Sequence, residues 1–215
     1  MILDDIWQYI KQVVFTVPSS ERLFNLYREV NLSFDRETAN EIRQQNLMSY
    51  FSSFTERPTI LIVGEAPGPK GCRFPGVPFT SESQLCRHIL PFSGEQSSLN
   101  GPYSEITANV FWKAITQYHS KIFVWNCIPF HPHNPGDFLS IRAPTNEEIS
   151  RFSKILSEIY LKLKPERIIA IGKKSASLLS KLDIKFTYIR HPSHGGIEAF
   201  NEGISSFFRN LNTTK

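Results

Sequence analysis

The pattern of apolar and polar positions changes about a quarter of the way along the chain. Before Pro58, apolar residues recur at spacings of three and four, the period of an amphipathic helix. This spacing predicts helices over residues 4–15, 20–30 and 35–54. Ser19 and Ser20 lie at the start of the second segment, Asp35 opens the third, and all three are residue types that favour helix N-caps.

After Pro58 the chain contains short, almost wholly apolar runs of strand length. These runs are TILIV (59–63), IFVW (122–125), RIIAI (167–171) and FTYI (186–189). Helical stretches separate them, and in the clearest one Thr145 and Glu148 form a capping box ahead of an apolar stripe. Apolar strands alternating with helices predict an α/β fold whose parallel sheet is covered on both faces.

The chain shows the organisation of one domain. Its 215 residues suffice for a single well-packed core, and it contains no internal repeat, low-complexity tract or linker. We therefore expect one domain over residues 1–215, with N-terminal helices in residues 1–55 and a core in residues 58–212. No apolar run approaches the roughly 18–20 residues that a membrane span needs.

The composition of the chain indicates more about its cellular compartment than about its function. Cys72, Cys86 and Cys127 are dispersed and odd in number, which fits a reducing cytosol and excludes a fully paired disulfide framework. The N-terminus carries acidic residues where a secretory signal is basic, so we expect a cytoplasmic protein. A net charge of +4 and a pI near 9.0 agree with a nucleic-acid partner without establishing one.

Residues with chemical potential follow directly after the predicted strands, where open parallel sheets bind ligands. The four strands are followed by Gly64-Glu65-Ala66-Pro67-Gly68, by Asn126, by Gly172-Lys173-Lys174-Ser175 and by His191-Pro192-Ser193. The third of these segments lacks the glycine spacing of a phosphate-binding loop, so we interpret it as a structural helix start. The other three are candidates for function.

Each candidate suits a particular task. Glu65 is the carboxylate of a Pro- and Gly-rich loop whose backbone N–H groups can approach a ligand. The amide of Asn126 offers an acceptor and two donors, which suits the imide edge of uracil. His191 could donate to a developing anion and Ser193 could hold a phosphate. Taken singly, these residues also fit a solvated turn, a loop cap and a structural strand end.

Taken in order, these motifs resemble the uracil-DNA glycosylase superfamily. The resemblance rests on GEAPG (64–68), GVPF (76–79), Asn126 behind an apolar strand and HPS (191–193), and it spans about residues 60–193. The first motif is most similar to that of the family 4 enzymes. The resemblance implies a three-layer α/β/α fold with a central four-stranded parallel sheet. It also implies water-mediated, monofunctional hydrolysis of the N-glycosidic bond of uracil in DNA.

The resemblance also implies a role for each matching residue. Glu65 would position the attacking water, and His191 would stabilise the departing uracil anion. The uracil site would be formed by Gly64, Ala66, Pro67, Gly68, Phe79, which stacks on the base, and Asn126, which reads its Watson–Crick edge. DNA would be contacted by Ser193, Pro192 and His194.

The sequence departs from family 4 in ways that point to a divergent branch. Family 4 enzymes hold an iron–sulfur cluster on four cysteines, whereas this chain has three cysteines and no CxxC, so we expect no cofactor. His131 and His133 lack the further spaced ligands of a metal site, so we expect no metal. The first loop lacks the acidic pair that often follows GEAPG, and Ile197 is the candidate for an apolar DNA wedge.

The expected partner is DNA containing uracil or another deaminated base, bound by a monomer that flips the base out of the helix during base excision repair. One alternative is a glycosylase for hypoxanthine or xanthine. A second is a catalytically silent damaged-DNA-binding protein of the same fold. A third is an unrelated nucleotide-binding α/β protein.

Overall fold

Four parallel strands form the central sheet of the structure, a computed structural model that describes residues 1–213, with side chains as far as Leu211. The strands are β2 (Ile60–Gly64), β3 (Ile122–Asn126), β5 (Arg167–Ile171) and β6 (Thr187–Ile189), in the order β3-β2-β5-β6. Each coincides with one of the apolar runs, to within one residue at each end. Both central strands are buried along almost their whole length because helices cover the two faces.

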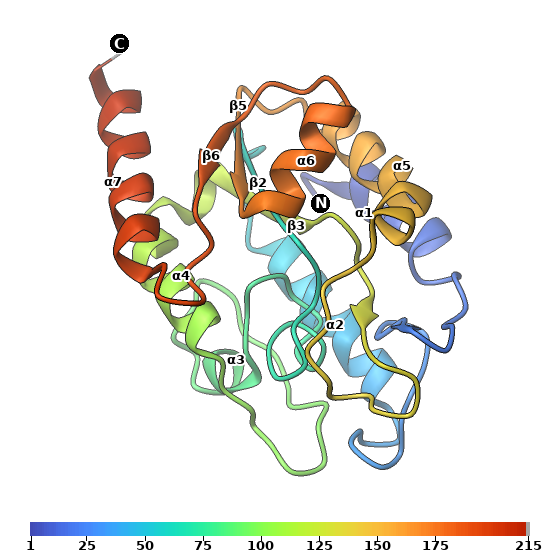
Figure 1. Cartoon of the computed structure of the whole chain (residues 1–215). Helices are drawn as coiled ribbons and strands as arrows, with labels where there is room; N and C mark the ends of the chain where they lie inside the picture. The colour runs from blue at the N-terminus through green and yellow to red at the C-terminus, as the bar shows by residue number, and fades with distance from the viewer. Residues whose placement is uncertain (214–215) are drawn as a thin grey trace.

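Helices form a layer on each side of this sheet (Figure 1). On one side lie α5 (Asn146–Leu163), α6 (Lys173–Lys181) and, packed on α5, α1 (Asp4–Val13). On the other side α4 (Ile106–Ile115) packs on α7 (Ile197–Thr213). The predicted three-layer α/β/α fold is thus confirmed. The structure also contains α3 (Glu82–Cys86) and a 3₁₀ segment, η1 (Thr116–Lys121).

The capping box predicted for α5 is present. Thr145 Oγ1 accepts a hydrogen bond of 3.1 Å from the Glu148 amide, and Glu148 Oε2 accepts one of 2.7 Å from the Thr145 amide. At the edge of the sheet, α2 (Ala39–Ser52) places the hydroxyl of Tyr50 2.7 Å from the backbone amide of Val124 in β3. This contact satisfies an amide that an edge strand would otherwise leave unpaired.

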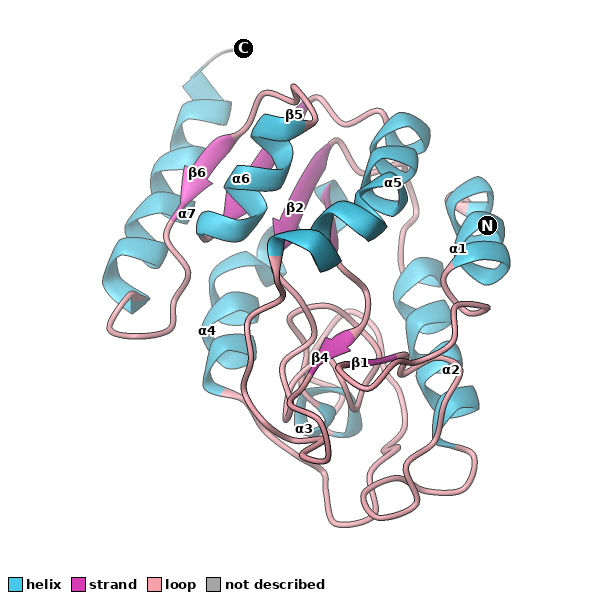
Figure 2. Cartoon of the chain, turned by 45° about the vertical axis from the view of Figure 1, so that its right-hand side comes forward, coloured by secondary structure: helices cyan, strands magenta, loops and turns pink. Residues whose placement is uncertain are grey.

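Long irregular segments gather beyond the carboxyl ends of the strands, in the lower half of Figure 2. They include the loops after β2 and β3 and a small antiparallel pair, β1 (Leu23–Phe24) with β4 (His131–Pro132). Among the described helices, none is both long and apolar enough to cross a membrane. The candidate motifs therefore lie on one end of a rigid sheet.

The helix predicted over residues 20–30 is wrong. That segment forms β1 and a series of turns, because Asn25 binds the backbone locally. The Asn25 amide nitrogen donates to the carbonyls of Val14 and Val17, and its Oδ1 accepts from the Tyr27 amide. Ser20 Oγ accepts from the Leu23 amide inside a turn rather than capping a helix.

The expected N-cap role of Asp35 is also wrong, and α2 begins at Ala39 rather than at Asp35. The Asp35 carboxylate lies 2.6 Å from Arg43 Nη2 and 2.7 Å from Arg73 Nη1, and all three side chains are fully buried. Burial alone would raise the pKa of Asp35, but the two guanidinium groups hold it below its ordinary value. Burial lowers the pKa of Arg43 to about 10, against the opposing effect of Asp35.

Replacing Asp35 with Ala should lower the free energy of unfolding by about 3–5 kcal/mol, because it leaves two buried guanidinium groups without their carboxylate. The matched control is Asp5→Ala, which removes an exposed pair with Arg57 (3.2 Å) and should cost less than about 1 kcal/mol. Urea unfolding at pH 7 measures both losses. Equal, small losses would show that the Asp35 cluster contributes little to stability.

Candidate active site

Three of the predicted base-binding residues meet where β2 and β3 end. The two strands pair in register, so Gly64 lies opposite Asn126. A Cβ atom at Gly64 would lie 2.3 Å from Cε2 of Phe79 and 2.6 Å from Oδ1 of Asn126. Any residue other than glycine would therefore displace the aromatic ring or the amide. The fold brings GEAPG, GVPF and Asn126 together, although they are far apart in the sequence.

Phe79 is held in an unusual backbone conformation. Its φ of 54° lies in the left-handed region, which is costly for an aromatic residue and persists only where packing over-determines it. The packing comes from Phe111 of α4, whose ring stacks on that of Phe79 at a centroid distance of 4.3 Å and an interplanar angle of 18°. The half-buried ring is thereby fixed beside Asn126.

Asn126 is largely buried as a residue, and its side-chain amide forms no hydrogen bond with any residue that the structure describes. The residue is 4% exposed, and buried polar side chains are as a rule hydrogen-bonded. Its Oδ1 lies close to the backbone of Gly64, beside the Phe79 ring. The amide is thus available to a planar polar ligand that enters next to Phe79.

Glu65 follows Gly64 and is half-buried at the same edge of the sheet. Burial raises its pKa above the ordinary value, and the ammonium group of Lys174 opposes this shift. Burial, and next the negative charge of Glu65, raise the pKa of the Cys127 thiol to about 12. Residues 172–175 start a helix, α6, as expected. Their sequence indicated a structural role and did not identify Lys174 as a cationic neighbour of Glu65.

His191 follows β6 in a hydrogen-bonded orientation that defines its tautomer. The backbone N–H of Ser193 donates to His191 Nδ1 at 3.1 Å, so the proton of the neutral ring lies on Nε2. Burial, and next the neighbouring His194, lower the pKa of His191, which favours the neutral ring at pH 7. Its centroid lies 6.3 Å from that of Phe79. A neutral N–H donor is therefore present at the edge of the Phe79 cluster.

The residues that follow His191 form a tight loop before α7. Ser193 Oγ lies 2.8 Å from Nδ1 of His191 and 3.0 Å from Nδ1 of His194, so its hydroxyl helps to orient the catalytic candidate. Pro192 is buried, whereas His194 is exposed. Ile197, at the start of α7, is 39% exposed, so the side chain of the wedge candidate can be reached from outside the protein.

His131 holds the rest of the first motif, residues 66–68, in place through the backbone of Pro67. Its Nδ1 lies 2.8 Å from the carbonyl oxygen of Pro67, and its Nε2 lies 3.1 Å from that of Phe138. Ala66 and Gly68 are half-buried on either side of Pro67. Within the part of the chain that the structure describes, no group of three His, Cys, Asp or Glu side chains is arranged to hold a metal ion.

Comparison with known proteins agrees with this geometry. The family model of the uracil DNA glycosylase superfamily matches residues 51–207, which is more than half of the chain. The chain belongs to the uracil-DNA glycosylase superfamily. It is therefore a DNA glycosylase in the broad sense, a hydrolase of DNA repair that acts on DNA.

A solved structure shows the same fold along almost the whole chain. The crystal structure of wild-type SMUG2 from Pedobacter heparinus is similar at a TM-score of 0.70 and 17% sequence identity, and the match covers 98% of each chain. No curated protein matches the sequence significantly. Because the structural match includes the N-terminal segment, that segment is part of the shared fold rather than an addition to it.

Glu105 is a second carboxylate at this glycosylase site, and the sequence motifs gave no sign of it. It precedes α4, and a Cβ atom at Gly68 would lie 2.7 Å from its Oε1. Burial raises the pKa of Glu105. The loop after β2 lacks the acidic pair that often follows GEAPG, but the carboxylate of Glu105 lies against this loop from a segment more than 30 residues farther along the chain.

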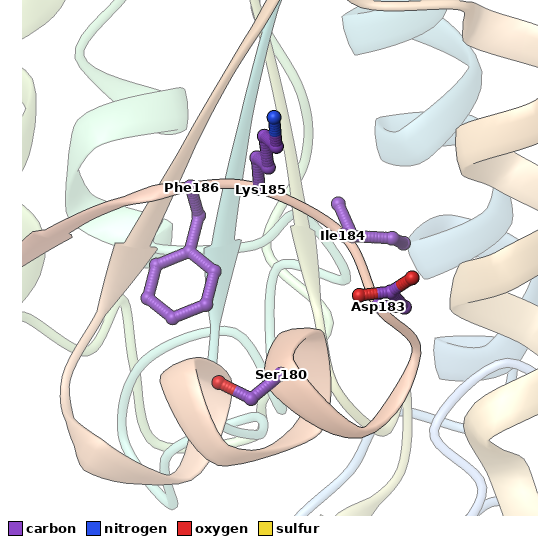
Figure 3. A pocket seen from close by; sticks show the side chains of 5 residues that line it. All are labelled: Ser180, Asp183, Ile184, Lys185 and Phe186. Atoms are coloured by element: carbon purple, nitrogen blue, oxygen red, sulfur yellow. The ribbon is translucent and has the colours of Figure 1, made fainter.

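The hollow shown in Figure 3 lies at the other end of the sheet. It has a volume of about 270 Å³ and is lined by residues at the end of α6 and in the connection to β6, namely Ser180, Asp183, Ile184, Lys185 and Phe186. These residues precede β6, whereas His191 follows it. The hollow therefore faces away from the glycosylase motifs and is not part of the site.

Replacing Gly64 with Ala should lower base release by at least about 10²-fold, because the new methyl group displaces Phe79 or Asn126. Gly136→Ala is the matched control: its Cβ meets nothing within 4 Å, although its φ of 77° makes the substitution mildly strained. Circular dichroism checks folding, and single-turnover release from uracil-containing DNA measures activity. Similar activity in the two variants would contradict the close packing described for Gly64.

Proposed function

We propose that this glycosylase releases uracil from DNA by water-mediated, monofunctional hydrolysis. The observation that carries the proposal is the contact of Gly64, Phe79 and Asn126, in which the Asn126 amide forms no hydrogen bond with any residue that the structure describes. Glu65 and His191 lie at the same edge of the sheet, at the ends of β2 and β6. A base flipped out beside Phe79 would therefore contact the amide of Asn126, the carboxylate of Glu65 and the N–H donor of His191.

The recognition step uses the hydrogen-bonding pattern of the base. Uracil presents an N3–H donor and an O4 acceptor, and one carboxamide can satisfy both. Cytosine presents the opposite pattern at these positions, so the same amide would leave polar groups unpaired. Phe79, supported by Phe111, would stack on the base and hold its plane beside Asn126.

The chemical step breaks the bond between the sugar C1′ and the base nitrogen, and the bonding electron pair leaves with the base. Glu65, as a carboxylate, would stabilise the positive charge on the sugar and orient a water molecule toward C1′. The water oxygen bonds to C1′, and its proton passes to Glu65. His191 would donate from Nε2 to the uracil anion, which needs no proton transfer. The immediate products are an abasic site, the uracil anion and protonated Glu65. Release to water lets the anion take up a proton and Glu65 lose one, which gives free uracil and restores the enzyme.

The loop after β6 is the part of the site best placed to contact the DNA strand. Ser193 and His194 are polar groups beside the exposed Ile197, with the buried Pro192 fixing the turn. We assign the two polar groups to phosphate contacts and Ile197 to the space that the flipped nucleotide leaves. Every residue assigned here comes from one chain, so a monomer suffices.

A second candidate substrate class is a deaminated purine. Hypoxanthine and xanthine present the same N–H donor next to a carbonyl acceptor as uracil does, so the Asn126 amide suits them equally. The choice between these bases depends on the size of the pocket. A panel of oligonucleotides that contain each base separates the two candidates.

Glu65→Gln and His191→Ala should each lower the single-turnover rate by about 10²–10³-fold while changing DNA affinity little, because both residues act on charge that develops in the transition state. Ser193→Ala should lower this rate less than His191→Ala, since the backbone donor to Nδ1 remains. Base release at saturating enzyme and binding to an uncleavable analogue measure the two effects. Loss of binding with unchanged saturated rates would contradict this mechanism.

The rate should also fall in acid as Glu65 is protonated. Because burial raises the pKa of Glu65, this fall should be centred above the ordinary value of 4.5, with the full rate present at higher pH. In Glu65→Gln the residual rate should lack this dependence. An acid limb that Glu65→Gln retains would assign the titration to another group.

Asn126→Asp should lower uracil release by roughly 10²-fold, because a carboxylate loses the donor to O4 and repels that oxygen. Selection against cytosine should fall at the same time. The control is Asn109→Asp on the exposed face of α4, which introduces the same charge away from the site. Equal rates for the Asn126 variant and the wild type, with the fold intact, would remove Asn126 from base recognition.

A further inference from the structure

Three consecutive backbone carbonyls just before Phe79 are each bound by a side chain from elsewhere in the chain. Ser97 Oγ donates to the Phe74 carbonyl at 2.6 Å. Asn46 Nδ2 donates to the Pro75 carbonyl at 3.0 Å, and the Tyr27 hydroxyl donates to the Gly76 carbonyl at 2.7 Å. We refer to residues 74–76 with these three side chains as the carbonyl clamp.

Two of the three donors come from the N-terminal segment, which carries none of the glycosylase motifs. Tyr27 and Asn46 are 1% and 2% exposed, so water does not compete for their contacts. Gly76 has a φ of 79° and packs directly on α2, where a Cβ would lie 2.7 Å from the Arg43 carbonyl oxygen. The clamped segment is thus fixed by direct contact as well as by hydrogen bonds.

The same segment is tied down at its start by charge. Arg73, immediately before the clamp, forms two hydrogen bonds to the carboxylate of Asp35, at 2.7 and 3.3 Å. On the far side of Phe79, the Thr80 hydroxyl accepts a hydrogen bond of 3.0 Å from Trp112 Nε1. The strained conformation of Phe79 therefore lies between two fixed points. Such strain persists only where the surroundings over-determine the backbone.

We propose that Tyr27 and Asn46 are positioning residues for base recognition, which hold the clamped segment so that the ring of Phe79 lies over Gly64 and beside Asn126. Neither residue need touch the base. The inference rests on the proposed function only in assigning the base to the face of Phe79. It gives the N-terminal segment a role in the site.

Tyr27→Phe is the most conservative test, because it removes one oxygen atom and keeps the ring and its packing. The unpaired Gly76 carbonyl should let the segment relax, and binding to DNA with an uncleavable uracil analogue should weaken by about tenfold, because the base loses part of its stacking on Phe79. Binding to undamaged DNA should not change. Ser53→Ala is the control, since it also removes a hydroxyl donor to a backbone carbonyl, at the C-terminal end of α2, together with a contact of 2.8 Å between this hydroxyl and Nε2 of His119.

A double-mutant cycle with Phe79→Ala separates positioning from general stability. If Tyr27 acts through Phe79, Tyr27→Phe should weaken uracil-specific binding in the wild-type background and have no further effect in Phe79→Ala. Additive losses, or a loss in Ser53→Ala as large as in Tyr27→Phe, would overturn the proposal.

A crystal structure of free Tyr27→Phe tests the same inference without any substrate. We expect the Phe79 ring to have moved from Gly64 or to occupy more than one position. An unchanged ring would overturn the positioning role even if the enzyme releases uracil. A wild type without preference for uracil-containing DNA would instead refute the proposed function, and the position of the ring would still decide the role of Tyr27.

Discussion

The close contact between the end of β2 and the Phe79 ring is the constraint on which the rest of the site depends. Gly64 leaves room for the ring edge and for Oδ1 of Asn126, and neither would fit against a side chain. The in-register pairing of β2 with β3 brings Asn126 to this point, and the left-handed turn at Phe79 brings the ring. The surrounding loops can be understood as the support that this arrangement needs.

Burial at the same edge of the sheet shifts the pKa values of Glu65 and His191, the two catalytic candidates, in opposite directions. It raises the pKa of Glu65 and lowers that of His191, so in both cases it disfavours the charged form. For His191 this favours the neutral Nε2–H donor, which in the proposed mechanism stabilises the uracil anion without transferring a proton. For Glu65 the cost of the charge is partly offset by Lys174. These pKa shifts agree with the proposed mechanism, in which charge develops during the reaction.

The sheet and its motifs could be predicted because they depend on local patterns. Each apolar run became a strand, and parallel strands place the residues that follow them at one edge. The N-terminal segment could not be predicted in this way. The spacing of its apolar residues is helical between residues 20 and 30, but Asn25 binds the backbone, and Asp35 pairs with Arg73, which is 38 residues away. Such contacts exist only once the chain has folded.

The same reason explains the residues that the motifs did not show. Lys174 and Glu105 reach the site from the starts of α6 and α4, and Tyr27 acts on Gly76 from a turn. Glu105 and Tyr27 lie outside every motif, Lys174 lies in the segment interpreted as a structural helix start, and the partners of all three are far away in the chain. The supporting residues could therefore be identified only from the folded structure. The candidate reactive residues could be identified from their order in the sequence, which was enough to suggest the family.

The most direct test of the account is whether the wild-type protein releases a free base from DNA. Oligonucleotides that contain uracil, hypoxanthine or xanthine are incubated with excess enzyme, and both the free base and strand cleavage are measured. The account predicts free uracil and a strand that stays intact until alkali cleaves it at the abasic site. Release of no base from any of the three, by a folded protein that binds the same DNA, would contradict it and indicate a silent binder.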